Sequence, residues 1–373
     1  MRRAQMTRRG FTLVELMVGV LIGVTITTAA VAFVRHETRL MGITNDRLGM
    51  VQSSRAAMDL LASDLRQAGL GTVSTDTGDF AGLYTGDFAL NGANFTSNAA
   101  VDLKPSQSVA GGYTVNSMDL GMRVAAGDQA TIVDFTGVGT TAGQIQVCNR
   151  PGLAFADDEL VLLQGEYNRA SLGVRLVQEV TAAGACPCQT TMGTPCRRFE
   201  WSLPGNDAQG WENDPSARNM NYVNGQVFGN HRTVVYFVDQ QDVATGKAEL
   251  YRMDFSELPG TCAAPARDPS CAGLVADNVE AIYYQVWTLA PGGGGWAQLT
   301  PGDPIPIAAR IRVDVELVVR GDKEKESEQP AVLADLGGGV RFPDAGRDRV
   351  ERQVFRTSVQ VRNAGIALNR SGT

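Results

Sequence analysis

A single acidic residue, Glu15, lies inside a long apolar run near the N-terminus. The run extends from Phe11 to Val34, and its length of about 24 residues is sufficient for a helix to cross a bilayer. A carboxylate in hydrocarbon is costly unless it has a partner, so an acidic residue in such a place marks a functional site by default. The chemistry that Glu15 offers is ion pairing with a positively charged group.

Six cysteines are the second set of residues with specific chemistry, and all of them follow the apolar run. They are Cys148, Cys186, Cys188, Cys196, Cys262 and Cys271. An even number of cysteines there predicts an oxidising compartment and up to three disulfides. We expect Cys262 and Cys271 to pair, because they enclose a short loop; the other pairings stay open. Zinc is the weaker interpretation, since the spacing lacks paired C-x-x-C ligands and neither histidine lies nearby in sequence.

Other residues suited to catalysis are few. Of the two histidines, we assign His36 to the membrane edge and His231 to a loop before a strand. The glycine-rich segment 137–143 lacks the spacing of a nucleotide-binding loop and the helix that should follow it. The acidic clusters at 157–159 and 239–242 lack EF-hand spacing, which favours solvated acids over a calcium site. We therefore expect no enzyme, no cofactor and no metal site.

The charge of the chain is unevenly distributed. The 373 residues carry a net charge of −7 and are 43% hydrophobic, which is sufficient for a packed core. Arg2, Arg3, Arg8 and Arg9 precede the apolar run, and without these four the remaining 29 basic residues face 40 acidic ones, a balance of −11. An acidic body disfavours extended contact with phosphates, so no nucleic-acid partner is expected.

The N-terminal segment has two ordinary interpretations that leave residues unexplained. A cleaved secretory signal fits the basic start and the small residues at 30–32, but it does not fit the long run or Glu15. A plain signal anchor with a cytoplasmic N-terminus fits the arginines. It explains neither Glu15 nor Gly10.

The third interpretation rests on the segment Gly10-Phe11-Thr12-Leu13-Val14-Glu15, which resembles the cleavage motif of type IV prepilins and type II secretion pseudopilins. The resemblance implies that a prepilin peptidase removes residues 1–10 as a leader by cutting after Gly10, and that the new amino group of Phe11 is then methylated. It also implies that Glu15 pairs with the terminal ammonium of a neighbouring subunit. That pairing would neutralise both charges and fix the axial register of the incoming subunit.

The span 11–69 contains no proline and predicts one helix, roughly 85 to 90 Å long, with its membrane-spanning part at 11–34. Apolar residues recur at three- and four-residue steps in its second half and predict a stripe packed on a globular domain: Leu48, Val51, Met58, Ala62 and Leu65. Charged residues lie between them: Arg47, Asp59, Asp64 and Arg66. Gly19 and Gly23 allow close helix packing, although this spacing also arises by chance. Gly69 and Gly71 are expected to end the helix.

Period-two patterns predict antiparallel strands in the rest of the chain. The clearest are 310–319 and 352–362, separated by a charged loop at 321–328. Further strands are predicted at 129–135, 160–163, 174–180, 197–203, 233–239, 248–255 and 279–289. The fold class is therefore α+β, with a long N-terminal transmembrane and amphipathic helix packed on an enlarged antiparallel β-sheet domain at 70–373, as in pilins.

Further residues are similar to the PilW family of minor pilins. They are the helix end at 60–69, the segment Ala276-Asp277-Asn278-Val279-Glu280-Ala281-Ile282, and Arg362-Asn363 after the last strand. The middle of the chain, roughly residues 71–275, is matched only loosely and is enlarged.

By this resemblance the protein is a minor pilin that primes type IV pilus assembly, lies at the pilus tip and serves adhesion and twitching motility. Its expected partners are other minor pilins, the major pilin, the prepilin peptidase, the inner-membrane assembly platform and a tip adhesin. We expect it first in the inner membrane with its body in the periplasm. Two alternatives remain open: a J-like minor pseudopilin of type II secretion, and a surface-binding or DNA-binding tip module.

Overall fold

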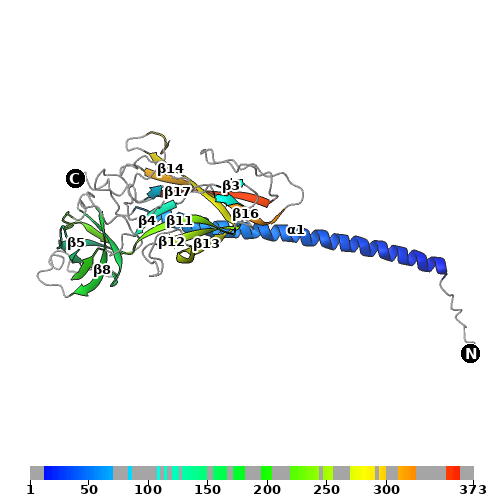
Figure 1. Cartoon of the computed structure of the whole chain (residues 1–373), viewed down its shortest axis with the longest axis horizontal. Helices are drawn as coiled ribbons and strands as arrows, with labels where there is room; N and C mark the ends of the chain where they lie inside the picture. The colour runs from blue at the N-terminus through cyan, green and yellow to red at the C-terminus, as the bar shows by residue number, and fades with distance from the viewer. Residues whose placement is uncertain are drawn as a thin grey trace, which may run out of the picture. The chain divides into compact units, whose positions relative to one another are not determined.

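The computed structural model describes most of one long helix and the strands that follow it (Figure 1). The described residues are 12–69, 83–85, 107–109, 113–115, 120–125, 128–148, 154–165, 171–180, 195–203, 219–242, 247–254, 269–289, 294–299, 310–324 and 350–361. Two compact units divide the chain, residues 1–51 and residues 52–373, and each is described by itself.

The predicted long helix is present as α1 (Leu13–Gln67). Residues 13–51 of α1 make up the described part of the first unit, apart from Thr12. Gly69 follows the helix with a φ of 78°, the left-handed conformation that a glycine adopts at little cost just after a helix.

The part of α1 in the second unit has one fully buried face. Its members at 0% exposure are Ser54, Ala57, Leu61 and Leu65, and Ala68 continues the face into the chain beyond the helix. Met58 and Ala62 are buried as predicted, whereas Leu48 is 52% exposed and the prediction for it is wrong. Asp64, placed among the charged residues between the apolar positions, is only 7% exposed, because strands of the second unit supply its partners.

A five-stranded antiparallel sheet lies beside this face of α1, in the order β1-β4-β11-β12-β13. Its strands are β1 (Leu83–Thr85), β4 (Leu120–Ala125), β11 (His231–Asp242), β12 (Lys247–Asp254) and β13 (Gly273–Asp277). Ala68 forms a bridge to Val124 in β4, and Asp64 reaches β11 and β12. On the other face of the sheet, a second cluster joins Val235, Phe237, Tyr251 and Met253. Side chains therefore pack on both faces of this sheet.

Six strands form a closed barrel in the order β10-β5-β6-β9-β8-β7. They are β5 (Gln129–Phe135), β6 (Ala142–Cys148), β7 (Leu160–Gln164), β8 (Ser171–Val180), β9 (Cys196–Ser202) and β10 (Gln226–Phe228). The short strand β10 closes the barrel by pairing with β5 on one side and β7 on the other. Aromatic and aliphatic side chains from all six strands fill the interior, among them Phe135, Phe199 and Trp201. The interior is thus a packed core.

The barrel is an insertion between two neighbouring strands of the five-stranded sheet. The chain leaves that sheet at Ala125 in β4 and returns at His231 in β11, and these two residues lie opposite each other in the register. A backbone hydrogen bond of 2.8 Å from the Gly229 amide to the Asp128 carbonyl holds the two ends of the insertion together. The enlarged middle of the chain therefore contains a separate barrel between strands that would otherwise form one hairpin.

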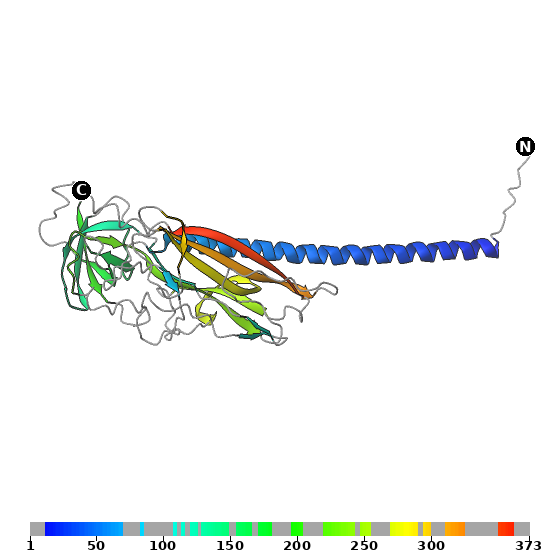
Figure 2. The same ribbon diagram turned by 90° about the horizontal axis from the view of Figure 1, so that it is seen from above.

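A four-stranded sheet completes the second unit, in the order β15-β14-β16-β17 (Figure 2). Its strands are β14 (Val279–Leu289), β15 (Ala297–Gln298), β16 (Arg310–Glu324) and β17 (Val350–Val361). The strands β2 (Gln107–Val109) and β3 (Tyr113–Val115) pair with each other as a separate two-stranded sheet. Alternate residues of β16, such as Ile311 and Val313, are fully buried, which is the predicted period-two pattern.

All nine predicted strands are present, two of them with the predicted bounds and the others with ends that differ by a few residues. The charged loop predicted at 321–328 is wrong at its start, because β16 continues to Glu324 in pairing with β17. The strands β1 to β4, β6, β10, β13 and β15 are additional to the predicted ones. The glycine-rich segment 137–143, set aside as a nucleotide loop, forms the turn from β5 to β6 and the start of β6. Gly71 lies outside the described residues.

Candidate functional site

The predicted processing site falls at the border of the described residues. Gly10 and Phe11 lie outside them, so cleavage after Gly10 and methylation of Phe11 stay predictions. Thr12 is the first described residue and directly precedes α1.

Glu15 is bound to the start of its own helix. Its Oε2 accepts hydrogen bonds from the Thr12 amide and the Thr12 hydroxyl, both at 2.9 Å, while the Glu15 amide donates to the Thr12 hydroxyl at 3.3 Å. This reciprocal pair is a capping box, which satisfies amide groups that the first turn of a helix leaves without acceptors. The spacing Thr12-x-x-Glu15 carries this signal in the sequence, in addition to the charge pairing predicted for Glu15. Pairing of Glu15 with a neighbouring ammonium stays a prediction.

The helix that follows Glu15 exposes its apolar side chains on all sides. One 18-residue window of α1 has a mean hydropathy of 2.3, and none of that window is buried. By length and composition α1 can therefore cross a membrane. The hydroxyls of Thr25, Thr27 and Thr28 donate to carbonyls of the preceding turn at 2.7 to 2.8 Å. These polar side chains are satisfied within the helix and need no partner in lipid.

Gly19 and Gly23 lie on this exposed part of α1. A Cβ atom added at either position would meet nothing within 4 Å, so both glycines leave open surface on the helix. Such surface permits close approach of a second helix, and packing at these two glycines stays a prediction. His36 is also exposed on α1.

Asp64 anchors the second half of α1 to the five-stranded sheet. Its Oδ2 accepts a hydrogen bond of 2.7 Å from the Tyr236 hydroxyl and one of 2.9 Å from Arg252 Nε. The Arg252 side chain is 21% exposed and the Asp64 side chain 10%, so the ion pair is largely shielded from water. Burial, reinforced by the Asp64 carboxylate, raises the pKa of Tyr236 far above its usual range, which keeps the hydroxyl protonated as the donor. The helix is thus fixed by a specific polar contact as well as by apolar packing.

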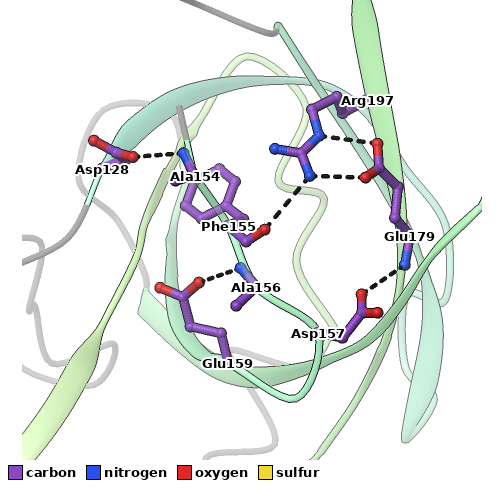
Figure 3. Close-up of polar contacts among 8 residues, drawn as sticks. All are labelled: Asp128, Ala154, Phe155, Ala156, Asp157, Glu159, Glu179 and Arg197. Carbon is purple, nitrogen blue, oxygen red and sulfur yellow. Dashed lines mark hydrogen bonds and ion pairs between the residues drawn. The ribbon is translucent and has the colours of Figure 1, made fainter. Parts of the chain in front are cut away.

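The segment 154–159 crosses one end of the barrel (Figure 3) and forms hydrogen bonds with residues at both ends of the insertion. Asp128, before β5, accepts a hydrogen bond of 2.6 Å from the Ala154 amide. Glu159 accepts from the Ala156 amide at 2.7 Å and from the Asn230 amide at 2.6 Å. Since Asp128 and Asn230 flank the insertion on its two sides, this segment fixes both ends of the barrel.

An ion pair between the barrel strands β8 and β9 holds the same segment (Figure 3). Arg197 donates from Nε and Nη2 to the two oxygens of Glu179 at 2.9 and 2.7 Å, and from Nη2 to the Phe155 carbonyl at 3.4 Å. The hydrogen bond from Arg197 lowers the pKa of Glu179. Asp157 accepts from the Glu179 amide at 3.0 Å. The acidic cluster 157–159, which was predicted to be solvated, therefore has structural partners within the chain.

The residues that resemble a PilW segment form the connection from β13 to β14. Asn278 has a φ of 59° and makes the turn between the strands. The bulge after it directs Glu280 to Arg352, with contacts of 2.6 and 3.1 Å, and towards Arg320 at 3.8 Å. Arg320 and Arg352 lie opposite each other in the β16–β17 register. Glu280 thus forms ion pairs with two neighbouring arginines, a role that the sequence pattern did not reveal.

Three of the six cysteines are described, and all three are in disulfide bonds: Cys148, Cys196 and Cys271. Among the described residues none is a free thiol. Cys186, Cys188 and Cys262 lie outside the described residues, so the connectivity, including the pair Cys262–Cys271, stays a prediction. His231, predicted in a loop, is instead the first residue of β11 and is 1% exposed. In the described part of the chain, no three residues of His, Cys, Asp and Glu gather as a metal site.

Comparison with known proteins bears on the N-terminal segment. Residues 5–31 match the family model described as the prokaryotic N-terminal methylation motif, which supports a pilin or pseudopilin. No curated protein matches the chain. Among solved structures, the chain is similar to a type IV-like pilin from Thermus thermophilus, with 14% identity over 56% of this chain and 86% of that one. The TM-score of 0.20 is too low for this likeness to bear on the function.

Proposed function

We propose that the chain is a minor pilin of the PilW kind, which primes assembly of a type IV pilus and lies at its tip. The observation that carries the proposal is the match of residues 5–31 to the N-terminal methylation motif, at the start of a helix with an exposed apolar surface. A helix with that surface lies in lipid or packs against other helices. The proposed partners are other minor pilins, the major pilin, the prepilin peptidase, the assembly platform and a tip adhesin.

In this proposal Glu15 changes partner during assembly. In the single chain the carboxylate is bound by Thr12 at the helix start. In a filament it would face the terminal ammonium of a neighbouring subunit, and a charge pair in lipid is favoured over two separate charges. The apolar helix supplies the packing surface, and the second unit stays in the periplasm until it is exported with the filament.

The test is to identify the N-terminus of the mature protein by mass spectrometry. The proposal requires that the chain begins with an N-methylated Phe11. A chain that starts at Met1 or after residues 30–32 would contradict it.

A second experiment compares Glu15→Ala with the unchanged protein. The variant should be inserted and cleaved normally but be reduced about tenfold or more in sheared filaments, because its buried charge pair is lost.

A J-like minor pseudopilin of type II secretion is the nearest alternative, because the N-terminal motif serves both systems. Deletion of the gene distinguishes them. Loss of surface pili with normal protein secretion supports the pilus. Loss of secretion with normal piliation supports the pseudopilin.

A further inference from the structure

Three side chains form a stack on the four-stranded sheet. The guanidinium carbon of Arg312 lies 4.9 Å from the ring centre of Trp287 and 5.1 Å from that of Trp296. Trp287 and Arg312 are opposite each other in the β14–β16 register, and Trp296 directly precedes β15. We call these residues the tryptophan–arginine stack. Trp287 and Arg312 lie on the paired strands β14 and β16 (Figure 1), so their relative position is set by the backbone pairing.

The stack lies on the face of the sheet opposite the buried residues of β16. Ile311 and Val313 are at 0% exposure, whereas Arg312 between them retains 29% of its side-chain exposure. Both tryptophans are partly exposed as well. Tryptophan and arginine are the residue types that dominate protein interfaces. Because Arg312 holds the rings in place, a partner would lose little side-chain freedom on binding to them.

Two donor atoms of the stack are buried without an acceptor in the described part of the chain, Nε1 of Trp287 and Nε of Arg312. The carboxylate that Arg312 does contact is that of Asp314, at 3.2 Å from Nη2, and the Ser358 hydroxyl donates to the same carboxylate. Buried donors in folded proteins generally have acceptors. The stack is therefore short of acceptor atoms.

A comparable arginine in the barrel has the acceptors that Arg312 lacks. Arg197 lies over the ring of Phe199 at 4.8 Å, and its Nε and Nη2 both donate to Glu179. The same combination of arginine and aromatic ring thus occurs twice in the second unit. At Arg197 a carboxylate of the chain binds two donors, whereas at Arg312 the buried Nε has no acceptor in the described part of the chain.

We infer that the tryptophan–arginine stack binds an acidic, extended segment of another protein. A carboxylate of that segment would bind the exposed part of the Arg312 guanidinium, whose side chain retains 29% of its exposure, and an apolar side chain would cover Trp296. The adjacent strand β15 is at the edge of its sheet and has only two residues, both exposed. Such an edge accepts an additional strand. Arg310, exposed at the start of β16, adds positive charge at the same end of the sheet.

Charge favours a protein segment over nucleic acid as the occupant. Binding to a strand of phosphates depends on many basic contacts. This end of β16 offers only Arg310 and Arg312 among its described residues, in a chain of net charge −7. Two arginines and two aromatic rings match one or two carboxylates with neighbouring apolar side chains. They do not match a continuous polyanion.

The test measures binding of three probes to the full-length protein in detergent at low salt. The probes are a peptide of alternating glutamate and valine, the same peptide with glutamine in place of glutamate, and single-stranded oligothymidylate. We expect the glutamate peptide to bind, and the glutamine peptide to bind about tenfold more weakly or less. Arg312→Gln and Trp296→Ala should each weaken binding of the glutamate peptide by about tenfold. Arg197→Gln is the matched control and should leave the affinity unchanged.

Equal affinity for the two peptides would overturn the inference, as would no binding of either. Binding of oligothymidylate that depends on Arg312 and Trp296 would also overturn it, in favour of a nucleic-acid site.

Arg312→Lys retains the charge and loses the flat guanidinium, so an intermediate affinity is expected. Circular dichroism identifies any variant that fails to fold. Trp296, at the sheet edge, then provides the decisive variant, because it is partly exposed and outside the core. The result is independent of the proposed pilin function.

Discussion

The N-terminal part of α1 and the barrel use apolar residues in opposite ways. In the helix, Leu13 is 75% exposed and Leu21 is 69% exposed. In the barrel, Val161 and Leu163 are at 0% exposure and belong to the cluster of side chains that fills the interior. The barrel therefore gains stability from apolar burial within its own chain. The helix keeps its apolar surface for lipid or other helices, so the same kind of residue is structural in one region and available for binding in the other.

The two regions also differ in the range of their hydrogen bonds. The helix satisfies its polar groups locally, as when Thr27 donates to the carbonyl of Gly23. The barrel depends on distant pairings such as β6 with β9. A helix of this kind holds its shape alone in lipid, whereas the barrel requires every strand to be present at once.

The largest expected effect comes from removing a core side chain of the barrel. Trp201 is 1% exposed, is stacked on Phe135 with ring centres 5.4 Å apart, and donates from Nε1 to the Thr136 carbonyl at 3.2 Å. Trp201→Ala should lower the free energy of unfolding by about 3–5 kcal/mol, because it leaves a cavity. Leu21→Ala in the exposed helix should change it by less than about 0.5 kcal/mol. Denaturant unfolding of the full-length protein in detergent measures both. Equal losses of unfolding free energy in the two variants would contradict the different roles of apolar residues in the helix and in the barrel.

The second largest effect on stability is expected at Asp64, in the part of α1 that packs against the five-stranded sheet. Asp64→Ala removes the carboxylate that binds Arg252 and Tyr236. It leaves Arg252, whose side chain is 21% exposed, without that partner. We expect a loss of about 2–4 kcal/mol in the free energy of unfolding, somewhat below the cost for a fully buried pair.

The control for Asp64 is Asp59→Ala on the same helix. Asp59 is exposed, so this change should alter the free energy of unfolding by less than about 0.5 kcal/mol. If both variants unfold at the same denaturant concentration, the polar anchor has no energetic role.

A third pair of variants replaces a glycine by alanine in each region, and the two replacements should change the stability of the protein in opposite directions. Gly137 in the barrel has a φ of 98°, and an added Cβ would lie 2.6 Å from the Ala142 carbonyl oxygen. Gly137→Ala should therefore destabilise the protein by about 1–3 kcal/mol. Gly49 lies in α1 with nothing within 4 Å of an added Cβ. Gly49→Ala should be neutral or stabilise the helix by up to about 1 kcal/mol. Thermal unfolding measures both, and a stabilising Gly137→Ala would contradict the left-handed turn.

The helix and most single strands are predictable from sequence because their signals are local. The absence of proline over 11–69 marks α1, and the alternation at Ile311 and Val313 marks β16. Burial of Asp64 is not predictable in this way, because its partners Tyr236 and Arg252 are far away in sequence. A charged residue on a helix is exposed unless the fold supplies such partners.

The barrel could not be predicted from the strand patterns. Period-two alternation indicates that a strand has one buried face, but it does not say which strands pair. The closing strand β10 has three residues, too few for a pattern. The register of Ala125 with His231, which makes the barrel an insertion, is visible only once β4 and β11 are paired. For Glu15, by contrast, the capping signal Thr12-x-x-Glu15 was present in the sequence.

The smallest expected effect is the pH dependence of the ion pair between Arg197 and Glu179 in the barrel. The hydrogen bond from Arg197 lowers the pKa of Glu179 below its ordinary value of 4.5. A carboxyl whose pKa is lower in the folded chain stabilises the fold above pH 4.5, and that contribution is lost as the pH falls through the folded pKa. Glu179→Gln should therefore cost less than about 1 kcal/mol at neutral pH, because the Glu179 side chain is 44% exposed. Unfolding measured from neutral to acidic pH should show the two proteins converging in the acid range. A constant difference at all pH values would assign the role of Glu179 to packing instead of charge.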